Sequence, residues 1–284
     1  MTYAAQHFDP APETNLVVPS WISNARAQTS EDVVFLSGAM LGELDRVAGY
    51  PGLPRPLWRD RLALWATEEA MQIAGRPERM ADLRDEVHLA RPGDTLGPGG
   101  VVFADWRRAV RTRLKPTRGQ MPMIAASETL EAALDADMQD DAAALRAADT
   151  ALARAMGWPH MVPLLALGLA QRDLRKRGAA LRHACGQAVI AAGPRAVHLA
   201  QDLTRRAARL QAVAPKLRAK GAGAAVTLFL SEDALSPAVA LSPIIRGSAN
   251  RMTGRSARRL CDRLVDLGVV RELTGRDTFR LYGL

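Results

Sequence analysis

The side chains best suited to chemistry lie near the C-terminus, where arginines follow a threonine typical of a helix N-cap, Thr253. The helix predicted after it repeats apolar residues at spacings of three and four: Ala257, Leu260, Cys261, Leu264 and Leu267. The polar residues largely off that face are Arg255, Ser256, Arg258, Arg259 and Arg263. A helix that enters the major groove of DNA presents its N-terminal residues to base edges. Arginine reads guanine there with two hydrogen bonds, whereas hydroxyl groups are more permissive.

The pattern predicts base contacts from Arg255, Ser256 and Arg259, and phosphate contacts from Thr253 and Arg258. The alternative is a solvated, arginine-rich face, which is common on surface helices. The helix alone does not separate these two interpretations, and the segment that follows it favours DNA binding.

A β-hairpin is predicted directly after the basic helix, with strands over residues 269–273 and 278–282. Gly275 is the first of two central turn residues, as a type II′ turn requires, and Arg276 is the second. This register places Arg271 opposite Arg280. The face that covers the helices then holds Val270, Phe279 and Leu281. Because two arginines directly across a ladder repel each other, we expect a DNA phosphate between or near them.

Two further helices are expected to support the basic one, over residues 220–230 and 235–245, with a polar turn at 246–250. Together with the hairpin they give the order of a winged helix-turn-helix domain, placed at residues 215–284. The basic residues that open this domain are Lys216, Arg218 and Lys220, and we expect them near DNA.

Composition predicts a mainly α fold, because alanine, leucine and arginine dominate and aromatic residues make up only 5%. Residues 1–28 are interpreted as a disordered lead-in and residues 29–214 as an all-α, multi-helix body. Helices are expected from about residue 30 to 48 and at 57–74, 78–89, 101–113, 127–138, 140–156 and 195–213. Pro194 is expected to break the pattern before the last of these.

Charge is distributed unevenly: residues 171–284 hold 21 Lys and Arg against 8 Asp and Glu, whereas residues 1–170 are net acidic. A basic half suggests that one end of the chain meets a polyanion, through contacts that carry no sequence information. The sequence has no apolar run long enough for a transmembrane helix and no secretory signal, so we expect a cytoplasmic protein without a membrane partner.

Catalytic and metal-binding patterns are not found in the sequence. The five histidines have no metal-ligand spacing, two cysteines cannot build a zinc site, and no nucleophile elbow occurs. The acidic residues Asp135, Asp137, Asp140 and Asp141 are interpreted as a solvated helix junction rather than a cation site. We therefore expect no enzyme activity, no cofactor and no metal.

Several stretches resemble an uncharacterised bacterial family, the domain of unknown function numbered fourteen hundred and three. They lie at residues 31–39, 91–98, 106–108, 212–222, 255–260, 271–276 and 279–283. The last three are the most specific, and the Leu-Gly helix end before a Thr-Gly-Arg hairpin is similar to the ending of other bacterial helix-turn-helix proteins. The resemblance implies that these segments form one full-length unit, and it implies no activity.

The functional expectation is a DNA-binding protein, a transcriptional regulator that reads double-stranded DNA with its C-terminal winged helix. Its helical body would form a homodimer or contact a partner. The alternative is a protein–protein adaptor whose winged helix docks a protein, and steep salt dependence of binding would separate the two.

Overall fold

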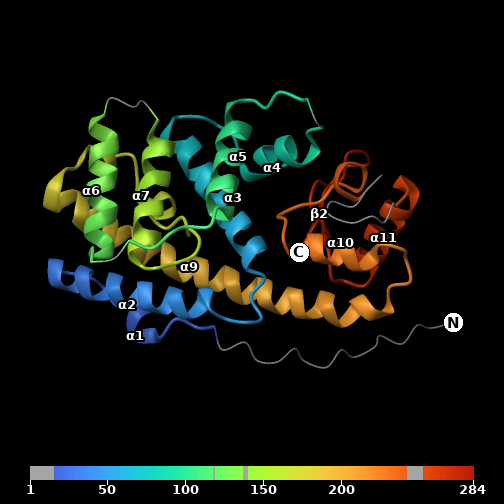
Figure 1. Ribbon diagram of the computed structural model, residues 1–284, viewed down its shortest axis with the longest axis horizontal. Helices are drawn as coiled ribbons and strands as arrows, with labels where there is room; N and C mark the ends of the chain where they lie inside the picture. Colours follow the sequence, from blue (N-terminus) through green and yellow to red (C-terminus); the bar gives the residue numbers. More distant parts are fainter. Residues whose placement is uncertain (1–15, 92, 118, 137–139, 242–251) are drawn as a thin grey trace.

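A computed structural model describes residues 16–91, 93–117, 119–136, 140–241 and 252–284. The chain is mainly helical, with one small antiparallel sheet near the C-terminus (Figure 1). The helices are α1 (Ser20–Ser23), α2 (Ser30–Ala48), α3 (Arg55–Ile73), α4 (Met80–Leu89), α5 (Pro98–Arg111), α6 (Pro122–Asp135), α7 (Asp141–Ala155), α8 (Leu165–Gly168), η1 (Asp173–Arg175), α9 (Gly178–Val213), η2 (Ala214–Lys216), α10 (Ala222–Phe229), η3 (Pro237–Leu241) and α11 (Gly254–Asp266). The strands are β1 (Arg271–Glu272) and β2 (Tyr282–Gly283).

The long helices α2 and α9 run side by side and form the base of the molecule (Figure 1). Helices α6 and α7 pack together at one end of this base, and α3, α4 and α5 form the centre. Helices α10 and α11 and the sheet gather at the opposite end, beside the C-terminal half of α9. One continuous hydrophobic core connects residues of all these parts.

Most expected helices are present within a few residues of their predicted bounds, and α2 shows why. The Thr29 side chain accepts a hydrogen bond from the Asp32 amide, and the Asp32 carboxylate accepts one from the Thr29 amide, which forms a capping box. One face of α2 is buried against α9, so that local capping and the apolar period specify the same element.

The predicted break at Pro194 is wrong, because α9 continues through this residue from Gly178 to Val213. A proline inside a helix costs about 3 kcal/mol, through the missing N–H and a clash with the preceding turn. Buried residues on both sides of Pro194 offset this cost. The preceding residue, Gly193, lies so close to the Met40 side chain that a Cβ atom there would collide with it. Tertiary packing against α2 therefore overrides the local preference of proline.

The expectation of a disordered lead-in at residues 1–28 is wrong where the structure describes that segment. Leu16 and Ile22 are buried and belong to the core, and α1 packs on α2. Residues 1–15 lie outside the described part of the chain. The sequence did not reveal this because isolated buried residues between prolines produce no periodic signal.

The sheet at the C-terminus differs in register from the predicted hairpin. Arg271 pairs with Gly283 and Glu272 with Tyr282, so the connection between the strands is longer than a two-residue turn. Glu272 explains the difference, because its carboxylate accepts hydrogen bonds from the amides of Thr274 and Gly275, both at 2.8 Å, and so shapes the start of the loop. Leu235 forms a further antiparallel bridge to Tyr282.

Candidate nucleic-acid interface and the ion-pair network behind it

Helix α11 begins at the predicted cap. The Thr253 hydroxyl accepts a hydrogen bond from the Ser256 amide at 3.2 Å and lies 3.0 Å from the Ser256 hydroxyl, so both side chains serve the cap. The predicted apolar face is confirmed, since Ala257, Leu260, Cys261 and Leu264 are buried. This packing fixes which side of the helix faces solvent.

The exposed side of α11 carries arginines. Arg255, Arg258 and Arg259 are exposed, and within the described part of the chain none of them forms a hydrogen bond or ion pair. The long side chains are therefore free to reach outward from the first turns of a capped helix. The end of the helix predicted at 235–245 and the polar turn predicted at 246–250 fall within residues 242–251, outside the described residues.

The predicted hairpin arginines are arranged differently from the expectation. Arg271 does not face Arg280. Arg276 forms an ion pair with Asp85 of α4 at 2.7 Å, and Arg280 forms one with Asp277 at 3.3 Å. Both arginines thus have carboxylate partners, and the predicted pair of mutually repelling arginines is wrong.

Phe279 also departs from the prediction that it covers the helices. Its side chain is 67% exposed, and its backbone adopts a left-handed conformation with φ of 54°. Val270 and Leu281 are buried as predicted. The longer loop turns Phe279 outward, because the register moves it off the strand that was expected to hold it.

Two clefts flank α11 and bring together arginines from distant parts of the chain. The first, of about 580 Å³, is lined by Arg271 and by three arginines of α9: Arg205, Arg206 and Arg209. The second, of about 460 Å³, is lined by Arg258, Arg280 and Arg91. The sequence analysis missed the α9 arginines, although their spacing within a single helix was a usable signal.

The three basic residues before α10, Lys216, Arg218 and Lys220, are exposed in and after η2. They lie on the connection between α9 and α10, and no described contact joins Arg218 or Lys220 to α11. Their predicted role near DNA stays a prediction.

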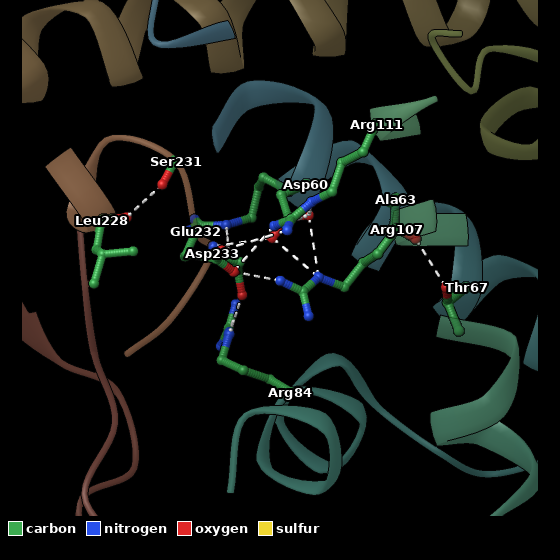
Figure 2. Close-up of polar contacts among 11 residues, drawn as sticks. Asp60, Ala63, Thr67, Arg84, Arg107, Arg111, Leu228, Ser231, Glu232 and Asp233 are labelled. Atoms are coloured by element: carbon green, nitrogen blue, oxygen red, sulfur yellow. Dashed lines mark hydrogen bonds and ion pairs between the residues drawn. The ribbon is translucent and has the colours of Figure 1, made fainter. Parts of the chain in front are cut away.

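Behind this surface lies a buried network of charges that the sequence analysis did not anticipate (Figure 2). Asp60 of α3 accepts from Arg107 at 3.1 Å and from Arg111 at 2.9 Å, both on α5. Arg111 also pairs with Glu232 at 3.0 Å, and Arg107 contacts Glu232 as well. The network therefore joins α3 and α5 to the segment that follows α10.

Asp233 connects the same segment to two more arginines and to the backbone. Its fully buried carboxylate pairs with Arg84 of α4 at 2.5 Å and with Arg61 of α3. Its amide donates to Asp60 Oδ2 at 3.2 Å. The sequence analysis gave Glu232 and Asp233 no role, because an acidic pair in a strongly basic half does not distinguish a buried carboxylate from an exposed one.

The network sets the charge states of its members. Burial alone would raise the pKa of Asp233, but Arg61 and Arg84 hold it well below its usual range. For Asp60, burial raises the pKa even though Arg107 and Arg111 oppose that change. Burial alone would also raise the pKa of Glu232. The hydrogen bond from Arg111 and the charge of Arg107 outweigh this effect and hold the pKa below its ordinary value. Each carboxylate of the network pairs with arginines of another element, so we assign the network a structural role.

His88 of α4 lies against this network and gives it a pH dependence. Burial, then the charges of Arg107 and Arg84, lower its pKa to about 3, against the opposing pull of Asp233 and Glu232. Its Nε2 atom is buried and has no hydrogen-bond partner among the described residues. The histidine is therefore neutral in the folded protein at every pH above about 3.

We expect His88→Leu to make the free energy of unfolding fall less steeply as the pH is lowered. The unfolded chain protonates His88 near pH 6.5 and the folded one only near pH 3, so this group removes stability as the pH falls below 6.5. Between pH 7 and 5 the loss is about 2 kcal/mol. Urea unfolding of wild type and variant at pH 7 and pH 5 measures it, with His198→Leu, an exposed histidine, as the control. An equal acid loss in wild type and His88→Leu would contradict the assignment.

Within the part of the chain that the structure describes, no helix has the length and apolarity to span a membrane. The same residues contain no group of three or more His, Cys, Asp or Glu arranged to hold a metal ion.

Comparison with known proteins gives one finding. No curated protein and no solved structure matches the chain significantly. A family model described as "Protein of unknown function (DUF1403)" matches residues 11–126 and 112–284, which together span nearly the whole chain. The two matches cover the helical body, the buried network and the arginine-bearing helix α11 alike, and the chain belongs to the DUF1403 family.

Proposed function

We propose that this protein is a cytoplasmic DNA-binding regulator that contacts double-stranded DNA with α11. The observation that carries the proposal is the exposed row of Arg255, Arg258 and Arg259 at the start of a capped, firmly packed helix. These guanidinium groups have no carboxylate partner among the described residues, and a phosphate or a guanine edge would accept two hydrogen bonds from one of them at once.

The arrangement of the last segment supports a winged helix. A winged helix has a helix, a short strand, two further helices and a two-stranded wing that pairs with the first strand. Here α10 is followed by the bridge residue Leu235, then by one π-helical turn at Pro237–Leu241, and later by α11, β1 and β2. Leu235 pairs with β2, and β2 pairs with β1, which is the order expected for such a wing.

The basic surface extends beyond α11 and fits the backbone of a duplex. Arg205 and Arg209 of α9 are exposed and line one cleft with Arg271, beside α11. Phosphate contacts position a protein on DNA while base contacts supply the sequence preference. We therefore assign phosphate contacts to Arg209 of α9 and to Arg271, and base contacts to the first turns of α11. Arg205 and Arg206 already pair with Asp202 of their own helix, at 3.5 and 2.8 Å, so their part in DNA binding is smaller. Since Arg276 and Arg280 have carboxylate partners, we give them a smaller role than the sequence suggested.

The test is fluorescence-anisotropy titration of the whole chain with a random DNA duplex at low and moderate salt. We expect binding whose affinity falls steeply with salt, because each phosphate contact releases a condensed counterion. Failure to bind at low salt would overturn DNA binding and favour the adaptor, whose winged helix docks a protein.

We further propose that the regulator is a homodimer formed through the outer face of α2. Figure 1 shows α2 at the edge of the molecule, with α9 on its inner side. Phe35 is 64% exposed and lies 5.8 Å from the ring of Trp21 of α1, which is itself 55% exposed. Val34 is 73% exposed and lies beside Phe35 in the chain, one helical turn before Gly38. Large apolar patches with this exposure mark interaction sites more often than scattered single residues do.

Two glycines on the same face, Gly38 and Gly42, indicate a close approach by another helix. A Cβ atom at either position would meet no atom within 4 Å, so packing within the described chain does not require glycine there. Gly186 of α9 is different, because a Cβ atom there would lie 2.6 Å from the Val33 side chain. A glycine inside a helix costs about 1 kcal/mol relative to alanine. Contact with a second molecule would account for that cost.

The occupant we assign is a second copy of α2 in antiparallel orientation. Centring the pair between residues 38 and 39 places Phe35 of each copy opposite Gly42 of the other. The same register places Glu31 opposite Arg46, which is oppositely charged and already pairs with Glu43 of its own helix. Glu31, Phe35, Gly38, Gly42 and Arg46 recur at spacings of three and four and lie along one helix face. A single two-fold axis therefore places complementary shapes and opposite charges against each other along the two copies of α2.

We expect Phe35→Arg and Gly42→Leu each to convert the dimer to a monomer. Arginine introduces a charge into the apolar contact, and leucine fills the position where Phe35 of the other copy packs. Gly42→Leu leaves the monomer intact, because the position is exposed and leucine favours a helix more than glycine does. Phe35→Arg removes only the exposed contact with Trp21, so the monomer should still fold. Sedimentation velocity over a concentration range centred on the micromolar scale measures the effect, since a face of this size gives a modest affinity.

The matched control for this experiment is Phe279→Arg, which changes a similarly exposed phenylalanine at the other end of the molecule. It should leave the dimer unchanged. A wild-type chain that stays monomeric at all concentrations would overturn the dimer and leave the α2 face to a different partner. A dimer that survives both α2 variants would show that another surface forms it.

A further inference from the structure

A second cationic site lies on the helical body, away from α11. It is a pocket of about 610 Å³ between the end of α2, the start of α3 and the segments that follow α5 and α7. Three arginines and a histidine line it: Arg55, Arg59, Arg113 and His160. The lining contains one carboxylate, Asp45, which accepts a hydrogen bond from the Trp158 indole at 2.9 Å. The lining therefore carries a net positive charge.

The arginines of this pocket keep their charge uncompensated. Arg55 donates to the carbonyls of Ala48 and Gly49, at 2.6 and 2.8 Å, which fix its position without cancelling its charge. Arg59 and Arg113 have no hydrogen bond or ion pair with the described residues. The Nε atom of Arg59 is buried as well, so this donor has no partner in the described part of the chain.

The electrostatics agree with this geometry. Burial, then the neighbouring charges of Arg55 and Arg111, lower the pKa of Arg59 to about 10, although Asp60 opposes the change. Burial and the charges of Arg59 and Arg113 also lower the pKa of His160, against the hydrogen bond to the Thr112 carbonyl. Arg59 is half-buried and forms no ion pair, which is unfavourable for a charged group, and a bound anion would remove that cost.

The walls of the pocket beside the arginines are apolar. Trp58 is almost completely buried, and its indole N–H is already satisfied by the Ala196 carbonyl at 2.9 Å. Val162 and Pro56 complete this side. Ligand pockets typically combine such apolar walls with a few polar groups that fix orientation.

We infer that this pocket binds a small organic oxyanion, with a carboxylate or phosphate against Arg59 and Arg113 and an apolar body against Trp58 and Val162. Arginine suits this class because its planar fork donates two parallel hydrogen bonds to two oxygens. The site does not depend on the proposed DNA binding, because it shares none of its lining residues with α11 or the clefts beside it.

The experiment is isothermal titration and thermal unfolding of the whole chain with three probes: benzoate, phenyl phosphate and neutral benzamide. We expect the two anions to bind and raise the Tm, and benzamide, which has nearly the shape of benzoate, to do neither. Arg59→Gln and Arg113→Gln should each weaken anion binding about tenfold or more, as the loss of a charged hydrogen bond implies.

Controls keep this test decisive. Arg59→Gln removes a half-buried charge that forms no ion pair, so we expect it to fold at least as well as wild type without a ligand. Arg175→Gln changes an exposed arginine outside the pocket and should bind the anions as wild type does. The inference is overturned if neither anion binds, if benzamide binds as well as they do, or if Arg59→Gln keeps the wild-type affinity.

Discussion

Asparagine in place of Asp233 is expected to lower the free energy of unfolding by about 3–5 kcal/mol, the cost of breaking a buried ion pair by removing one partner. The Asp233 carboxylate is fully buried and pairs with Arg61 and Arg84, whose side chains are themselves only 15% and 14% exposed. Asparagine keeps the shape but removes the charge, which leaves two guanidinium groups without their counter-charge. A small protein has a total stability of only about 5–15 kcal/mol, so a loss of this size is severe.

The matched control is Asp105→Asn. Asp105 pairs with Arg108 at 2.9 Å and, more weakly, with Arg146 at 3.8 Å. All three side chains reach solvent, at 32%, 75% and 22% exposure. Exposed pairs contribute about 0–1 kcal/mol, so the control variant should remain close to wild type. Urea unfolding at pH 7 compares the three proteins. Equal stability of Asp233→Asn and Asp105→Asn would show that the network contributes no more than a surface ion pair.

The same variant reports on how the C-terminal segment is held. Asp233 and Glu232 follow α10, and their partners lie on α3, α4 and α5. The network therefore fixes the segment that carries α11 against the body. In Asp233→Asn, hydrogen exchange of α11 amides should accelerate more than that of α2 amides. The reason is that the ion pairs lost in this variant hold the segment after α10 against α3 and α4.

The sequence was most informative where local signals and tertiary packing agree. The Thr253 cap and the apolar period of α11 predicted the helix, its start and its buried face, and all three are confirmed. The bounds of α3 and α7 were predicted within about two residues for the same reason, because helix formers, a clear period and adjacent turn residues coincide there. Exposed arginines on α11 follow directly from that face assignment.

The parts that could not be predicted depend on contacts between residues far apart in the sequence. Pro194 remains inside α9 because of packing against α2, which no local pattern records. The strand register depends on the hydrogen bonds that Glu272 makes to the following loop. The buried network joins Asp60 to Glu232 and Asp233 through arginines of two other helices, and surface and buried charges look identical in a sequence.

The triple replacement Arg255→Ala/Arg258→Ala/Arg259→Ala is expected to weaken DNA binding by a factor of at least about 100 at low salt. Removing one base contact costs about 1–3 kcal/mol, and removing one phosphate contact makes the slope of log K against log salt shallower by about 0.9. The fold should be preserved, because the three side chains are exposed, none pairs with a described residue, and alanine favours a helix. Fluorescence anisotropy with a random duplex at two salt concentrations measures both effects.

A second triple variant, which removes the same number of positive charges elsewhere, tests whether DNA binds at α11 or is attracted to the basic protein as a whole. Arg172, Arg175 and Arg182 are exposed at the start of α9 and just before it, and alanines there remove the same three charges. Asp202 is the first residue of α9 in the cleft beside α11, and Arg182 lies about 30 Å along the helix from it, at about 1.5 Å per residue. That distance is well beyond the screening length of about 8–10 Å. If α11 forms the interface, this control binds nearly as tightly as wild type and keeps its salt slope. Equal losses in the two triple variants would mean that net charge, and not α11, draws the protein to DNA.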